Sequence, residues 1–60
     1  DLSNNERMMC AYLKMNLSTK EIAPLLNISV RGVETIRYRL RKKFGLERED
    51  SLTDYLSNYL

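Results

Sequence analysis

Apolar side chains recur along the chain at intervals of three and four residues, which is the spacing of one face of an α-helix. The pattern predicts four helices, at about residues 4–15, 19–26, 30–44 and 51–59. The sequence therefore favours an all-α fold, a four-helix bundle containing a helix-turn-helix. Its core is expected to contain Met9, Leu13, Ile22, Leu26, Ile28, Val33, Ile36, Leu40 and Phe44.

Serine side chains mark the expected start of each helix. Ser3 is followed three positions later by Glu6, and Ser18 is followed in the same way by Glu21. In this arrangement, the capping box, the serine oxygen accepts a hydrogen bond from the glutamate amide and the glutamate carboxylate accepts one from the serine amide. The two remaining helices are expected to follow capping serines of their own, Ser29 and Ser51.

The expected helix ends carry residues that favour a left-handed backbone. Asn16 follows the first helix and Gly45 follows the third, and both residue types are frequent at such positions. Pro24 lies inside the short second helix and lacks the amide that would bond to the Lys20 carbonyl, so a bend or loosening is expected there. Residues 27–28 alone separate this helix from the next cap, which predicts a tight connection.

Composition narrows the chemistry of the domain. The chain has 60 residues, of which 43% are hydrophobic, enough for one small globular domain. It contains no histidine and a single cysteine, which excludes a His-based catalytic triad, a zinc site of the usual kind and a disulfide framework. No enzyme activity, metal or cofactor is expected, and we interpret Cys10 as a core residue.

The segments that direct proteins to membranes are also missing from the sequence pattern. No apolar run approaches the roughly 20 residues of a membrane span, and no signal-peptide pattern opens the chain. We therefore expect a cytoplasmic domain. Because the chain begins with Asp1 and not with methionine, we expect it to be part of a longer protein. A membrane-anchored sensor is compatible with this expectation.

Positive charge is concentrated in one segment. The whole chain has a net charge of +2, whereas residues 31–43 carry six basic side chains and a single acidic one, Glu34. At 100° per residue, Arg31, Arg39 and Lys42 lie opposite the apolar stripe of the same helix, and Arg41 lies toward one flank. A charge run is most often a solvated helix surface, but such surfaces usually mix both signs. The excess of arginine here, and the helix-turn-helix spacing, favour binding to nucleic acid.

Four motifs follow one another over almost the whole chain, without gaps through Leu46: Leu2-Ser3-x-x-Glu6, Leu17-Ser18-Thr19-Lys20-Glu21-Ile22-Ala23, Leu26-x-Ile28-Ser29-x-x-x-Val33 and Lys43-Phe44-Gly45-Leu46. Together they resemble the LuxR/GerE-type DNA-binding domain. The resemblance implies a C-terminal effector domain of a bacterial transcriptional regulator, with the third helix in the major groove and the fourth often pairing two domains. The arginine-rich segment is similar to that of members attached to sensors.

The resemblance and the exposed helix face together give candidate contacts. Predicted base contacts are Arg31, Glu34, Thr35 and Tyr38. Predicted phosphate contacts are Ser18, Lys20, Ser29, Arg37, Arg39, Arg41, Lys42 and Lys43. The apolar stripe of the last helix is expected to form a dimer interface through Leu52, Tyr55, Leu56 and Tyr59. The chain departs from the family pattern at four positions, which leaves the target sequence open: Gly32 for threonine, Glu34 for lysine, Ile36 for histidine and Arg39 for asparagine.

The expected partner is double-stranded DNA, bound by a homodimer, with RNA polymerase as a further candidate partner. No small-molecule ligand and no membrane contact are expected for this domain. Two other functions stay open: a sigma-factor-type promoter-binding domain, and a protein-interaction module whose basic helix contacts an acidic partner. The Gly45-Leu46 ending favours the regulator over the sigma-type domain, and an acidic protein partner does not explain an exposed Lys20.

Overall fold

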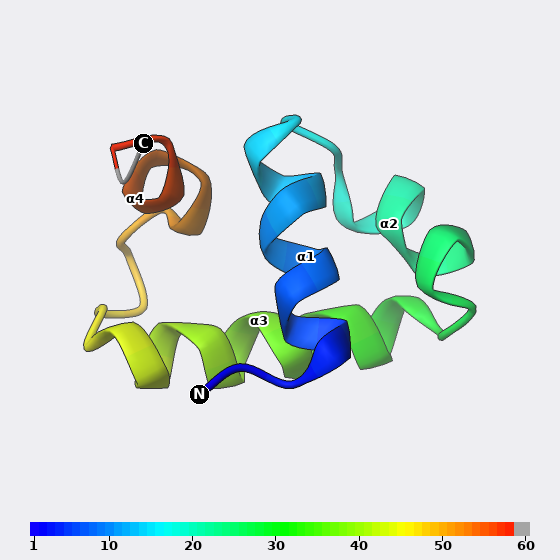
Figure 1. Ribbon diagram of the computed structural model, residues 1–60, viewed down its shortest axis with the longest axis horizontal. Coiled ribbons are helices and arrows are strands. Elements are labelled where there is room, and N and C mark those ends of the chain that lie inside the picture. The colour runs from blue at the N-terminus through cyan, green and yellow to red at the C-terminus, as the bar shows by residue number, and fades with distance from the viewer. Residues whose placement is uncertain (59–60) are drawn as a thin grey trace.

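The longest helix forms one side of the molecule, and the other three helices lie together on its other side (Figure 1). The computed structural model describes residues 1–58. In chain order the helices are α1 (Asn4–Lys14), α2 (Thr19–Leu26), α3 (Val30–Phe44) and α4 (Leu52–Ser57). The predicted all-α, four-helix fold is confirmed. Within the described part, no helix combines the length and the apolar character that crossing a membrane requires.

Each helix begins at the serine cap that the sequence predicts. The Ser3 hydroxyl accepts from the Glu6 amide at 3.2 Å, and the Glu6 carboxylate accepts from the Ser3 amide at 2.8 Å. Ser18 and Glu21 form the same reciprocal pair with the same two distances. The hydroxyl also accepts from the amide three positions on at the two remaining caps, Ser29 and Ser51. Local hydrogen bonds therefore set where all four helices start.

Three helices end in the same way, with one left-handed residue followed by an apolar one. The left-handed residues are Asn16, Asn27 and Gly45, with φ of 64°, 58° and 69°. After each, the amide of the next residue donates to a carbonyl five positions back, as in the Schellman motif: Leu17 to Tyr12, Ile28 to Ala23 and Leu46 to Arg41. These apolar residues are half-buried against the core, so each turn is held by packing as well as by hydrogen bonds.

The core lies between α3 and the three helices packed on it. The buried apolar side chains of the described residues are Met9, Leu13, Ile22, Ala23, Val33, Ile36, Leu40, Leu52 and Leu56. Six of these were expected from the sequence. The other three expected core residues, Leu26, Ile28 and Phe44, are half-buried at its edge. They lie at or next to a helix end, where neighbouring elements cover a side chain from fewer directions.

The last helix differs most from expectation. α4 begins after Ser51 as predicted and extends from Leu52 to Ser57, whereas the sequence pattern predicts a helix to residue 59. Residue 59 lies outside the described residues. α2 extends over Thr19–Leu26 with Pro24 inside it, which are the bounds that the sequence predicts.

Candidate nucleic-acid interface

α2 and α3 form a helix-turn-helix pair joined by a short, well-packed turn. Asn27 takes the left-handed conformation, Ile28 is half-buried, and Ser29 caps α3. Gly32, in the first turn of α3, lies close to this connection: a Cβ added there would be 3.4 Å from Ile28 Cβ and from Ser29 Oγ. The turn is therefore packed against the start of α3, which fixes the orientation of α3 relative to α2.

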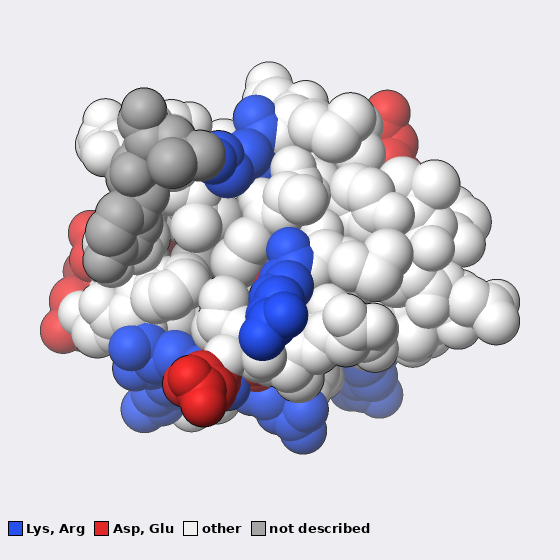
Figure 2. Space-filling model, in the orientation of Figure 1, with Lys and Arg blue, Asp and Glu red and all other residues white. Residues whose placement is uncertain are grey.

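The outer face of α3 carries all four residues predicted to contact bases. Arg31, Glu34 and Thr35 are exposed, and 60% of the Tyr38 surface is exposed. The Thr35 hydroxyl donates to the Arg31 carbonyl at 3.1 Å, which leaves its oxygen as an acceptor. In Figure 2, lysine and arginine side chains gather along the edge of the molecule formed by α3. The fold thus brings these four residues onto one accessible surface, and their contact with bases stays a prediction.

Tyr38 and Lys42, one helical turn apart, interact on this face. The Lys42 amine lies 5.6 Å from the centroid of the Tyr38 ring, within the range of a cation–π interaction. A large aromatic side chain that is mostly exposed beside a positive charge gains little by burial in its own domain. Such an arrangement suits a partner that offers flat apolar surface together with negative charge, as nucleic acid does.

Arg37 and Arg41 occupy one flank of α3 and are half-buried. Burial lowers the pKa of the Arg37 guanidinium, and the nearby charge of Arg41 lowers it further, whereas Glu34 opposes the shift. The Arg41 Nε donates to the Asp50 carbonyl at 3.4 Å. Arg39, by contrast, is exposed. These predicted phosphate contacts therefore differ in environment: two half-buried side chains lie on one flank of α3, and an exposed side chain lies on the other.

The predicted contacts at the starts of α2 and α3 are partly committed to capping. The Ser18 and Ser29 hydroxyls each accept from a helix amide and keep a hydroxyl proton to donate. At α2 the Glu21 carboxylate also accepts from the Ser18 amide at 2.8 Å and brings negative charge to the helix start. Lys20 is exposed beside it. For an anion at α2, the groups left include the Lys20 amine and the serine hydroxyl proton.

Lys43 has a structural role that the sequence analysis missed. Its amine donates to the Glu6 carboxylate at 2.8 Å and to the Asp1 carbonyl at 2.9 Å. The sequence predicts a phosphate contact for Lys43 because this residue lies in the basic segment. Its partner is 37 positions away in the chain, so no local pattern indicates the pair. The structure holds this amine on Glu6 while 42% of the Lys43 side chain stays exposed, and its contact with phosphate stays a prediction.

The structure also revises the dimer surface predicted on α4. Leu52 is fully buried and Leu56 is 6% exposed, so both belong to the domain core and cannot contact a second copy while the fold is intact. Tyr55 is half-buried and stacks on Phe44, with ring centroids 4.9 Å apart. Tyr59 lies outside the described residues. Their i, i+3, i+4 spacing indicated an apolar face correctly, but the domain itself covers most of that face.

One positively charged surface next to α3 was missed altogether. Arg48 follows α3 in the segment before α4, and its side chain lines a hollow together with Tyr38 and Lys42 from the outer face of α3. The sequence pattern gives residues 47–50 no predicted role in binding. The tight helix end at Gly45 was the available signal that this segment turns back toward α3, because a Schellman motif reverses the chain direction locally.

Comparison with known families gives one match that spans nearly the whole chain. The model of "Bacterial regulatory proteins, luxR family" matches residues 1–56, which include all four helix starts and the whole of α3. Searches of curated proteins and of solved structures give no match.

Proposed function

The chain belongs to the luxR family of bacterial regulatory proteins, and from that premise we propose that it binds specific sequences of double-stranded DNA with α3 in the major groove. Members of this family regulate transcription through a helix-turn-helix DNA-binding domain, and the family is not one of enzymes. Because its target would be chromosomal DNA, we place the domain in the cytoplasm.

The observation that supports this proposal is the two-sided character of α3. Its inner face is buried in the core through Val33, Ile36 and Leu40. Its outer face is exposed, and the helix carries a single acidic residue, Glu34. A 15-residue helix is about 22 Å long, and the major groove of B-DNA is about 12 Å wide and admits a helix. A rigid helix with a positive outer face therefore matches the groove in size and in charge.

Each predicted base contact has a specific chemical role in this arrangement. Arg31 is suited to bidentate bonds with guanine, and Glu34 is suited to accept from the amine of cytosine. Thr35 offers its hydroxyl oxygen as an acceptor, and Tyr38 offers a ring and a phenolic hydroxyl. A carboxylate among basic residues also repels phosphates and disfavours bases that present acceptors at that position. We therefore expect Glu34 to restrict which DNA sequences are bound more than it raises the affinity for DNA.

We further propose that two copies bind inverted half-sites and meet through α4, and that RNA polymerase is contacted at regulated promoters. With Leu52 and Leu56 in the core, the pairing surface is reduced to the outward residues around Tyr55. Asn58 is exposed at the end of α4, three positions after Tyr55 and on the same side of the helix, and it suits a test because its side chain lies outside the core. Asn58→Arg is expected to reduce occupancy of paired half-sites and to leave single half-sites unaffected. Unchanged paired occupancy would argue against pairing through α4.

Fluorescence anisotropy with labelled duplex DNA tests DNA binding directly. At low salt the chain is expected to bind duplex, and its affinity is expected to fall steeply as salt is raised, because each phosphate contact contributes about 0.9 to the slope of log affinity against log salt. Tyr38→Ala is expected to weaken binding, whereas Met15→Ala, a change to a similarly exposed apolar side chain just after α1, is the matched control. Absence of duplex binding at low salt would contradict the proposal and favour an acidic protein partner.

A further inference from the structure

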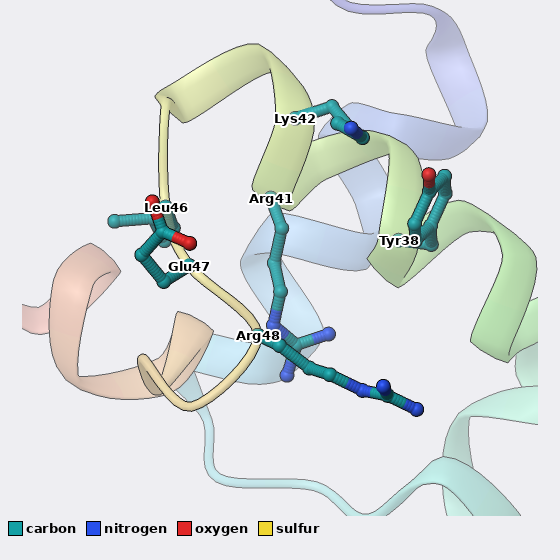
Figure 3. A pocket seen from close by; sticks show the side chains of 6 residues that line it. All are labelled: Tyr38, Arg41, Lys42, Leu46, Glu47 and Arg48. Atoms are coloured by element: carbon teal, nitrogen blue, oxygen red, sulfur yellow. The ribbon is translucent and has the colours of Figure 1, made fainter.

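A hollow of about 220 Å³ lies beside the outer face of α3, at its C-terminal half (Figure 3). Its lining combines residues of α3 with residues that follow it: Tyr38, Arg41, Lys42, Leu46, Glu47 and Arg48. Three of these side chains are cationic and one is acidic, so the lining carries a net positive charge. The hollow is next to the face proposed to read bases, but Arg48 is not part of any helix.

The segment that carries Arg48 is held in place by several hydrogen bonds. The Glu47 amide donates to the Asp50 carboxylate at 2.8 Å, and the Asp50 amide donates to the Glu47 carbonyl at 3.1 Å. The Asp50 carbonyl in turn accepts from Arg41 Nε at 3.4 Å, which ties the turn to α3. Leu46 is half-buried against the core. Arg48 is therefore presented from a fixed turn beside α3.

The cationic side chains around the hollow outnumber its single acidic side chain, that of Glu47. Among residues 1–58, no ion pair joins a carboxylate to Arg41, Lys42 or Arg48. The Asp50 carboxylate, in the same turn, accepts a hydrogen bond from the Glu47 amide. In Figure 3 the ends of the Arg41 and Arg48 side chains both lie in the lower part of the view, below Tyr38 and Lys42. Like charges held close together repel one another, and an anion placed between them relieves this repulsion.

The position of the hollow matches one wall of a DNA groove. At 100° per residue, Arg41 and Arg39 lie on opposite flanks of α3, with Arg31, Thr35 and Tyr38 between them. A helix in the major groove has a phosphate backbone on each side. Arg39 is exposed toward one flank. The hollow, with Arg48, lies on the other.

We propose that this hollow receives one backbone phosphate of the bound DNA, and that Arg48 supplies a contact which α3 alone does not provide. The inference rests on the proposed function. Guanidinium groups bind phosphate through two parallel hydrogen bonds, and the side chains of Arg48 and Arg41 both line the hollow. The occupant is a phosphodiester group of DNA, positioned by the simultaneous contact of α3 with the bases.

The first test compares the salt dependence of DNA binding by the unmodified chain and by Arg48→Ala. The variant is expected to reduce the slope of log affinity against log salt by about 0.9, which corresponds to roughly eightfold weaker binding at 0.1 M salt. Arg7→Ala on α1 removes the same charge from an exposed side chain and is expected to leave the slope nearly unchanged. Equal urea midpoints for the two variants and the unmodified chain would show that the fold is preserved.

The second test neutralises one phosphate at a time with methylphosphonate linkages in a selected duplex. Neutralising one particular phosphate is expected to lower the affinity of the unmodified chain for the duplex as much as Arg48→Ala does. The same neutralised phosphate is expected to cause no further loss of affinity in the Arg48→Ala variant. If the unmodified chain binds DNA but no position shows this coupling, the phosphate contact is wrong and DNA binding stands. If the unmodified chain binds no DNA, the proposed function itself fails.

Free phosphate is the other source of the same chemical group. Inorganic phosphate is expected to compete with duplex DNA no more strongly than chloride does at equal ionic strength. The hollow is open, and a free phosphate ion has no accompanying base contacts to hold it there. If inorganic phosphate abolishes the difference between the unmodified chain and Arg48→Ala at concentrations where chloride does not, the hollow binds the free anion. That result would overturn its assignment to DNA.

Discussion

Glu6, in the first turn of α1, forms an ion pair with Lys43, in the last turn of α3, with 2.8 Å between the carboxylate oxygen and the amine. The same carboxylate oxygen accepts a hydrogen bond from the Ser3 amide, so the start of α1 is linked directly to the end of α3. Glu6 is buried, whereas Lys43 keeps part of its side chain in solvent. A basic residue next to the proposed DNA surface thus helps to hold the domain together.

This pair makes stability depend on pH in a defined direction. The hydrogen bond from Lys43, and then that from the Ser3 amide, hold the pKa of Glu6 below its ordinary value of 4.5. A lowered pKa in the folded state means that the stabilising effect is complete above pH 4.5 and is lost as the pH falls through the lowered pKa. We expect Glu6→Gln to lower the urea midpoint at neutral pH and to match the unmodified chain more closely in acid.

Glu49→Gln is the matched control for this measurement, because Glu49 is exposed in the turn before α4. Its urea midpoint is expected to follow that of the unmodified chain across the same pH range. If Glu6→Gln and Glu49→Gln behave alike, the ion pair contributes nothing measurable to folding.

Truncation of Leu40 tests the assignment of the core. Leu40 is fully buried on the inner face of α3, and Leu40→Ala is expected to cost about 2–5 kcal/mol of unfolding free energy. Leu25→Ala removes the same atoms from a side chain that is 53% exposed, and is expected to change stability by less than about 0.5 kcal/mol. Both values come from chemical denaturation followed by circular dichroism. Similar losses for the two variants would show that the inner face of α3 is misplaced.

Gly32→Ala is expected to stabilise the domain. Glycine in a helix costs up to about 1 kcal/mol relative to alanine, and Gly32 lies in the first turn of α3. The added methyl group would meet Ile28 and Ser29 at 3.4 Å, an ordinary contact distance. A rise in the urea midpoint is therefore predicted. A fall would mean that the turn between α2 and α3 cannot accommodate even one methyl group.

Lys42 and Lys43 are neighbours in the sequence and are expected to act differently on DNA. Lys42→Ala is predicted to lower the slope of log affinity against log salt by about 0.9, because its amine is available to phosphate. Lys43→Ala removes the same charge from an amine already paired with Glu6, and is predicted to lower the slope less and the urea midpoint more. Anisotropy titrations at several salt concentrations measure the first effect. Equal slopes for the two variants would show that the ion pair opens on binding.

The sequence predicts helix boundaries well here because the signals that set them are local. A capping serine and its partner lie three residues apart, and Gly45 ends α3 through its own backbone conformation. The inner face of α3 follows from periodicity for the same reason, since one helix places Val33, Ile36 and Leu40 on one side.

Features that depend on the packing of distant segments did not follow from the sequence. The periodicity of α4 indicates that Leu52 and Leu56 are buried. It does not indicate whether they are buried within the same domain or against a second copy. The pairing of Lys43 with Glu6 and the return of Arg48 toward α3 depend likewise on how the helices meet. The exposed side chains of α3 were predictable because they need only the helix itself.

Selection of binding sites from a random pool of duplex DNA, carried out in parallel with the unmodified chain and with Glu34→Ala, tests the central claim most directly. We predict that the unmodified chain enriches a defined half-site, and that Glu34→Ala enriches the same half-site with the preference changed at a single position. Enrichment of no sequence by the unmodified chain would contradict specific DNA recognition. An identical site for both proteins would show that Glu34 takes no part in reading the bases.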